Sequence, residues 1–246
     1  MRSLSTDAIV LRKQNRGECD QSITLFSPVF GNFQALAKGA RKVSSKFSGH
    51  LEPLNICSLE LHHSAHGYTI TQCQAVKTYR YLRNDLKKSL LSMLILEVFQ
   101  KSTRTHGQGR ELFNLIEQTL DNISSGTKYS LIVESFKIKL MQILGILPEV
   151  ERCSFCHRKW DQDKEIFLDG GGQFSCMNCK PSHKITQTTP FNIIKLINFI
   201  CRNDYREIIK IRLPPKEGTL LKKISSAFLC RYLDHEILSE KILGRF

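Results

Sequence analysis

The first eighty residues alternate apolar and polar positions in short runs that predict β-strands. β-branched and aromatic residues are frequent in these runs, while glycine, proline and asparagine separate them. Five runs stand out, at residues 7–13, 22–27, 32–37, 56–61 and 68–73. Five short strands so close together in the chain favour a small barrel or sandwich.

Beyond residue 79 the apolar positions recur at helical spacing. The first such stripe begins after Asn84, a predicted N-cap, and the next two cover residues 112–123 and 129–144. Gly145 and Pro148 mark the end of the third helix. Thr189 and Pro190 have the N-cap and N1 pairing that begins another helix, and a last one is predicted over residues 219–243.

Between these two groups of helices lie two pairs of cysteines, Cys153 with Cys156 and Cys176 with Cys179. Each pair encloses two residues, and nineteen residues separate the pairs, which is the spacing of a four-cysteine zinc site. Four thiolates fill a tetrahedral zinc ion completely, whereas a catalytic zinc keeps one position open for water or substrate. The sequence therefore predicts one structural Zn²⁺.

Disulfide or redox chemistry is the competing interpretation of the cysteine pairs. Disulfide frameworks occur in oxidising compartments, mostly in small secreted domains. The N-terminus lacks the apolar segment of a secretory signal, and no apolar run is long enough to span a bilayer. We therefore expect a cytoplasmic protein, with the remaining cysteines reduced and buried as small apolar residues.

The net charge is a second constraint on the binding partner. The sequence has 36 Lys and Arg and 23 Asp and Glu, which gives a net charge of +13. The excess lies at the two ends: residues 1–83 carry +6 and residues 189–246 carry +5. Such a surface suits a polyanion, nucleic acid first and anionic membrane second. Together with five strands it favours an oligonucleotide-binding (OB) barrel.

The expected fold class is α+β and multidomain: a five-stranded OB-type β-barrel followed by an all-α domain with an inserted four-cysteine zinc ribbon. The barrel is predicted at residues 1–79, the helical domain at 80–152 and 186–246, and the ribbon at 153–185.

The segment between the third and fourth predicted strands is the strongest nucleic-acid candidate. It carries Lys38, Arg41, Lys42 and Lys46, and no acidic residue occurs from residue 21 to residue 51. Glycines and serines between the cations let the backbone approach phosphates, and Phe47 offers a ring for base stacking. A solvated charged loop is the alternative. Three further cations are candidates to extend the surface: Arg12, Lys13 and Arg80.

Catalytic signatures are missing from the sequence. It contains no phosphate-binding GxxxxGK[ST], no GxSxG nucleophile elbow, no HExxH and no HxE beside the cysteine pairs. His62, His63 and His66 gather at a predicted hairpin, where exposed turn residues are expected rather than a metal site. The sequence favours a binding protein that is not an enzyme.

The order of elements, together with one motif, resembles the RecO family of bacterial DNA repair proteins. Lys38-Gly39-Ala40-Arg41-Lys42, followed by Gly49, Leu51 and Pro53, matches a KGAR…G.L.P stretch of that family. The flanking features agree: Asp20 before a strand, the helical middle, the paired cysteines and the closing segment at residues 228–235. The end of the chain is less basic than the family's usual ending.

The resemblance implies a recombination mediator without enzymatic activity. It would bind single- and double-stranded DNA, anneal complementary strands, form a complex with RecR, contact single-strand-binding protein and help to load RecA. A nucleoid-associated, cytoplasmic location would follow. From the residues alone, an OB and zinc-ribbon RNA-binding protein of translation or ribosome assembly is the alternative, and an unrecognised nucleic-acid enzyme or a structural adaptor also stays open.

Overall fold

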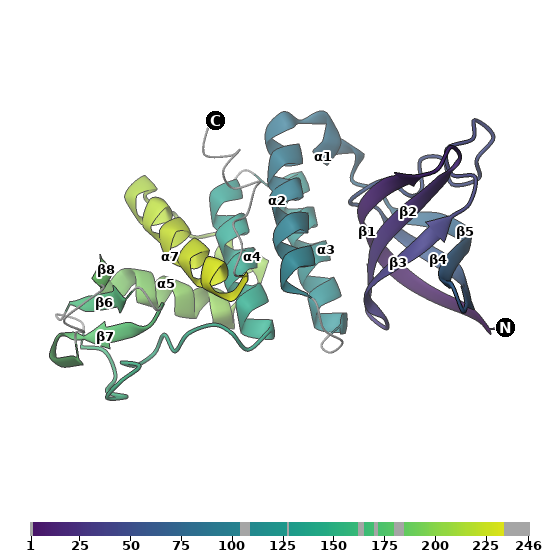
Figure 1. The fold of residues 1–246 in the computed structure, drawn as a ribbon. Coiled ribbons are helices and arrows are strands. Elements are labelled where there is room, and N and C mark those ends of the chain that lie inside the picture. The colour runs from purple at the N-terminus through teal and green to yellow at the C-terminus, as the bar shows by residue number, and fades with distance from the viewer. Residues whose placement is uncertain are drawn as a thin grey trace. The chain divides into compact units, whose positions relative to one another are not determined.

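The chain divides into two compact units, one up to Ser124 and the other from Ser125 (Figure 1). The computed structural model describes residues 2–103, 109–126, 128–161, 165–169, 172–179 and 185–233. No helix in these ranges is both long and apolar enough to cross a membrane.

Five strands in the first unit close into a barrel with the order β1-β2-β3-β5-β4. β3 and β5 run parallel, and the other neighbours are antiparallel. All five predicted strands are present, each longer than predicted, and the OB-type barrel is confirmed. The strands are β1 (Arg2–Arg16), β2 (Asp20–Ser27), β3 (Gly31–Ala37), β4 (Ile56–Ser64) and β5 (Gly67–Lys77).

Alternate residues of the strands fill the barrel, as the period of two requires. Ile23 and Leu25 of β2 and Leu59 and Leu61 of β4 are almost fully buried in one apolar cluster. The segment between β3 and β4 adds Phe47 to the same cluster. That segment is therefore part of the barrel's core as well as of its surface.

Three helices of the first unit follow the barrel: α1 (Arg80–Asn84), α2 (Leu86–Ser102) and α3 (Gly109–Ser125). The ring of Phe99 in α2 meets that of Phe26 in β2 edge-on at 4.8 Å between centroids. The N-cap of α2 is Asp85, whose carboxylate accepts a 2.9 Å bond from the Lys88 backbone N–H. The prediction of Asn84 was one residue early, because Asn84 ends α1.

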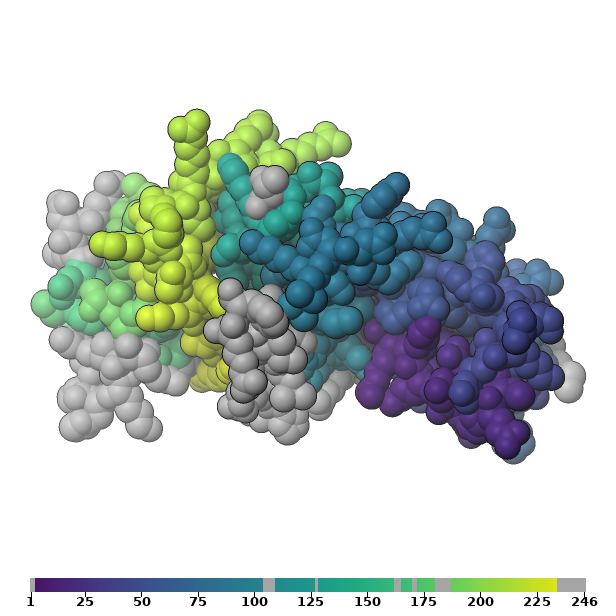
Figure 2. All heavy atoms as spheres, turned by 90° about the horizontal axis from the view of Figure 1, so that it is seen from above, coloured from purple at the N-terminus to yellow at the C-terminus, as the bar shows by residue number. Residues whose placement is uncertain are grey.

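The second unit is built on α4 (Tyr129–Ile143), which packs against α5 (Phe191–Arg202) and α7 (Pro215–Leu233). The side chains of α7, yellow in Figure 2, lie on the face seen there. α4 ends where predicted: Gly145 has φ 70°, and its N–H donates to the Gln142 carbonyl at 3.0 Å. The short α6 (Tyr205–Ile208) follows α5.

A three-stranded sheet interrupts this helical region, in the order β7-β6-β8. Its strands are β6 (Ile166–Asp169), β7 (Phe174–Cys176) and β8 (Ile185–Thr189), with the 3₁₀ turn η1 (Met177–Cys179) after β7. β8 was not predicted. The α+β class, with a barrel, helices and a cysteine-bearing ribbon, is confirmed, while the predicted domain boundaries stay predictions.

Candidate nucleic-acid interface and metal centre

The basic loop, residues 38–49, is tied down at both ends. At its start the backbone N–H of Gly39 donates to the Asp20 carboxylate at 2.8 Å, and Gly39 takes a φ of 68°, which favours glycine. At its end the buried Asn55 side chain donates to the carbonyls of Gly49 and His50, at 3.0 and 2.9 Å. These hydrogen bonds hold both ends of the loop backbone, from which the basic side chains project.

Arg41 joins the loop to the turn between β1 and β2. Its backbone N–H donates to the Cys19 carbonyl at 2.9 Å, and its guanidinium donates to the Gly17 carbonyl at 3.0 Å. The exposed Arg16 and Glu18 flank Gly17, so the turn adds one cation and one carboxylate to this surface. Arg16 was not predicted as part of this surface; the signal for it is a basic residue that borders a glycine turn between two predicted strands.

The other three loop cations project from the barrel. Lys38, Lys42 and Lys46 are exposed, and the Lys46 ammonium donates to the Thr71 carbonyl of β5 at 2.5 Å. Within the described ranges these lysines and Arg41 make no ion pair. The carboxylate of Asp20 nevertheless lies beside Gly39, so the surface around the loop is less positively charged than the sequence of the loop alone indicates.

Phe47 does not offer a stacking surface, and that expectation was wrong. Its side chain is 4% exposed and belongs to the barrel core. The Lys46 ammonium lies 5.4 Å from the Phe47 ring centroid. The ring therefore anchors the loop to the barrel, because burying a large aromatic side chain contributes strongly to the stability of a core.

The remaining predicted cations are not all equivalent. Arg12 is exposed on β1 opposite Thr24, whereas Lys13 is bonded at 2.6 Å to both carboxylate oxygens of Glu52. The charge of Lys13 is thus partly neutralised by Glu52, whereas Arg12 has no ion-pair partner among the described residues. Arg80 is exposed at the first position of α1.

Two further cations near the end of the barrel, Lys77 and Arg83, are engaged in contacts within the first unit. Lys77 pairs with Glu117 and Asp121 of α3, at 3.0 and 2.7 Å. Arg83 donates to the Pro53 carbonyl at 2.9 Å and is also bonded to Asn55.

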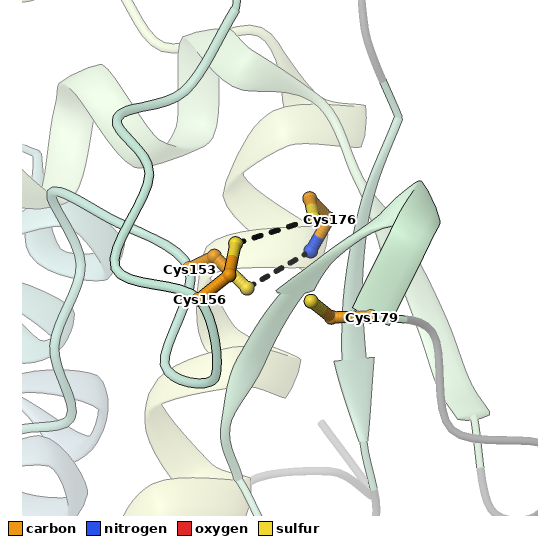
Figure 3. A group of neighbouring side chains, drawn as sticks. All are labelled: Cys153, Cys156, Cys176 and Cys179. Carbon is orange, nitrogen blue, oxygen red and sulfur yellow. Dashed lines mark hydrogen bonds between the residues drawn. The ribbon is translucent and has the colours of Figure 1, made fainter.

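The four paired cysteines converge on one point, with all their sulfur atoms within 4.8 Å of one another (Figure 3). Cys153 and Cys156 come from the loop before β6, Cys176 ends β7, and Cys179 ends η1. A tetrahedron of 2.3 Å bonds has edges of about 3.8 Å. The Sγ atoms of Cys156 and Cys176 are 3.8 Å apart, so the donors suit a tetrahedral metal ion.

Backbone groups polarise this cluster. Burial opposes ionisation of Cys153, but N–H groups of Cys156, Cys176 and Phe155 lower the pKa of its thiol to about 6. Hydrogen bonding with Cys156, and secondarily burial, raises the pKa of Cys179 to about 12. Four sulfurs this close resist ionising together, and a bound cation removes that conflict by stabilising every thiolate.

Among the described residues this is the one group of three or more His, Cys, Asp or Glu side chains placed to hold a metal. The histidines near the β4–β5 hairpin form no such group among the described residues. His63 and His66 are exposed as expected, whereas His62 is half-buried, and His62 and His63 belong to β4 rather than to the turn. The other five cysteines were expected to be buried, but only Cys57 is: Cys73 and Cys201 are half-buried, and Cys19 and Cys230 are exposed.

Comparison with known proteins gives matches to the same family along nearly the whole chain. Residues 1–79 match the family model for the N-terminal part of recombination protein O, and residues 83–241 match that for its C-terminal part. A DNA repair protein RecO of Dehalococcoides mccartyi strain BAV1 is 29% identical over 208 residues, which cover 85% of this chain and 82% of the relative. That of Thermoanaerobacter sp. strain X514 is 26% identical, covering 99% and 98%. That of Bacillus pumilus is 23% identical, covering 98% and 94%.

Proposed function

The chain belongs to the RecO family of DNA repair and recombination proteins, and from this premise we propose that it is a recombination mediator acting without covalent chemistry. In this proposal it binds single- and double-stranded DNA, anneals complementary strands and assists RecA loading together with RecR. It also contacts single-strand-binding protein. The single observation that carries the DNA-binding part is the basic loop, held at both ends on a closed OB-type barrel.

Phosphate contacts are assigned to the loop cations Lys38, Arg41, Lys42 and Lys46. Arg12, Lys13 and Arg80 are proposed as secondary contacts, with Lys13 contributing least because Glu52 already neutralises it. A fixed backbone supports this assignment, since less conformational entropy is lost when a pre-ordered loop binds. The loop's serines and glycines allow phosphates to approach its main-chain N–H groups.

Annealing follows from the same electrostatics. Two single strands repel each other through their phosphates, and a protein that neutralises part of both charges lowers that barrier. Phosphate contacts leave base edges unread, so they permit any complementary pair to form. The protein's task in this account is to gather strands without selecting their sequence.

The four cysteines are proposed to hold one structural Zn²⁺. Four thiolates in tetrahedral spacing are the donor set that zinc takes in closed structural sites. The ion would tie the loop before β6, which carries Cys153 and Cys156, to β7 and η1, which carry Cys176 and Cys179. It would thereby fix the strands between α4 and α5.

Annealing of complementary DNA strands coated with single-strand-binding protein tests the proposed function. Strands labelled with a fluorophore and a quencher report duplex formation directly. We expect the protein to accelerate annealing at near-stoichiometric amounts, and DNA to compete better than RNA of the same sequence. No acceleration would refute the mediator, and a preference for RNA would favour the RNA-binding alternative.

A further inference from the structure

Four aromatic rings gather at one rim of the barrel, supplied by different strands and turns. Phe30 follows β2, Phe33 lies in β3, His63 in β4 and Tyr68 in β5. The ring centroids of Phe33 and Tyr68 are 5.4 Å apart, those of Phe30 and Tyr68 5.8 Å, and those of His63 and Tyr68 4.7 Å. We call these four residues the rim cluster.

The backbone beneath the rim cluster is ordered by local hydrogen bonds. The Ser27 hydroxyl accepts from the N–H groups of Val29 and Phe30, at 3.0 and 3.3 Å, and lies 2.7 Å from the Thr6 hydroxyl. His63 and Tyr68 are directly opposed across the β4–β5 hairpin. The rings are thus held in place before any ligand arrives.

The rings of the rim cluster are incompletely covered. Phe30, Phe33 and Tyr68 are only partly buried against the core, and His63 is exposed. The apolar core beneath them is already closed by fully buried residues such as Leu25 and Leu61.

The surroundings of the rim cluster suit an anionic partner. All four rings come from two stretches of chain, residues 21–51 and 61–84, and neither contains an acidic residue. Glu60 is the nearest carboxylate along β4 and is engaged by the Ser3 hydroxyl at 3.3 Å. Phosphates next to the rings therefore meet little repulsion.

β5 connects the rim cluster to the basic loop. Lys46 is bonded to the carbonyl of Thr71, three residues beyond Tyr68 on the same strand. Three residues of strand span about 10 Å. A short stretch of single strand can therefore reach the Lys46 ammonium with a phosphate and the Tyr68 region with a base.

We infer that the rim cluster is a stacking site for unpaired bases of single-stranded DNA, separate from the phosphate contacts of the basic loop. The inference rests on the proposed function and specifies which part of the nucleic acid each surface takes. Every base has a π-face, so stacking on aromatic side chains binds single strands without reading their sequence. Duplex DNA keeps its bases stacked inside and gains nothing from this site.

Two probes of equal length distinguish base stacking from phosphate binding: oligo(dT) and an abasic deoxyribose-phosphate strand. The test variant, Phe30→Leu with Tyr68→Leu, keeps apolar bulk and removes two rings. The matched control, Tyr232→Leu, removes an exposed ring from α7. We expect the test variant to bind oligo(dT) at least about five-fold more weakly and the abasic strand unchanged. The control should bind both probes as the wild type does.

Equal losses on both probes, or no loss on oligo(dT), would overturn the stacking site. Photo-cross-linking of the unmodified protein to a strand containing 5-iododeoxyuridine decides the matter even if the variant misfolds. Cross-links at His63 or Tyr68 are expected, and cross-links confined to residues outside the rim cluster would overturn the inference. Failure of the wild type to bind either probe would instead refute the proposed DNA-binding function.

Discussion

The backbone N–H of Gly39 donates a 2.8 Å hydrogen bond to the carboxylate of Asp20, which ties the basic loop to the start of β2. The bond has two opposite consequences for a polyanion. It orders the backbone from which Lys38 and Arg41 project, and it places a negative charge beside them. The two effects can be separated by substitution.

Asp20→Asn keeps an oxygen acceptor and removes the charge, whereas Asp20→Ala removes both. We expect Asp20→Asn to bind single-stranded DNA up to about five-fold more tightly at low salt, because an exposed like-charge interaction is worth at most about 1 kcal/mol. Asp20→Ala should bind more weakly than Asp20→Asn, since its loop is less ordered. Fluorescence anisotropy with a labelled oligonucleotide measures both. Identical affinities for the two variants would show that the hydrogen bond has no role.

The cysteine cluster predicts about one zinc ion per chain in freshly purified, reduced protein. Cys153→Ser should lose the metal and lower the thermal midpoint by at least about 5 °C, because structural zinc binding contributes directly to folding. Elemental analysis and thermal unfolding measure the two effects. Cys19→Ser is the control, as Cys19 lies outside the cluster, and it should retain the zinc. A metal-free wild type would contradict the assignment.

Substituting one member of the buried ion pair in α4 should strongly lower the free energy of unfolding. Lys137 and Glu134 are 0% and 3% exposed, their charged atoms lie 3.1 Å apart, and the Ser225 hydroxyl also donates to Glu134. Lys137→Met leaves a buried carboxylate without its cation and should cost about 3–5 kcal/mol in the free energy of unfolding. Urea denaturation provides the measurement.

The double variant Lys137→Met with Glu134→Leu is the informative control for that pair. It should recover most of the lost stability, because a buried ion pair is often no better than apolar residues of similar size. A double variant as unstable as the sum of its parts would show that the pair is not the cause.

Stability at high pH should depend on Lys77. Burial lowers its pKa, but hydrogen bonds and charge from Asp121 and Glu117 outweigh burial and raise the pKa above 10.5. The stabilisation is therefore complete below pH 10.5 and is lost as the pH rises through the raised pKa. Lys77→Met should destabilise the first unit at neutral pH by about 1 kcal/mol or less, since the lysine is 36% exposed. The stabilities of the wild type and Lys77→Met should converge as the pH exceeds the raised pKa of Lys77, and a pH-independent difference between them would contradict this.

The strands were predictable from sequence because successive side chains of a strand point to opposite faces, so apolar residues directed into the barrel alternate with polar residues directed outward. The end of α4 was predictable because Gly145 supplies the left-handed conformation that stops a helix. The burial of Phe47 was not predictable, since a lone aromatic residue among charges has the same local pattern whether it closes a barrel or faces water.

Pairings between residues distant in the sequence were also not predictable. The bonds of Lys13 with Glu52 and of Gly39 with Asp20 join residues 39 and 19 positions apart. The register of the strands decides such contacts, and composition does not reveal it. The cysteine cluster was predictable, by contrast, because two residues between ligands largely fix the local geometry around one ion.

The salt dependence of single-stranded DNA binding tests the central claim most directly. Alanine at Lys38, Arg41, Lys42 and Lys46 should reduce the slope of log K against log salt by up to about three units, because each phosphate contact contributes about 0.7. The charge-matched control carries alanine at four exposed cations of the second unit: Arg212, Lys216, Lys222 and Lys223. We predict a clearly smaller change for the control. An unchanged slope and affinity in the loop variant would contradict the assignment of the basic loop as the DNA-binding surface.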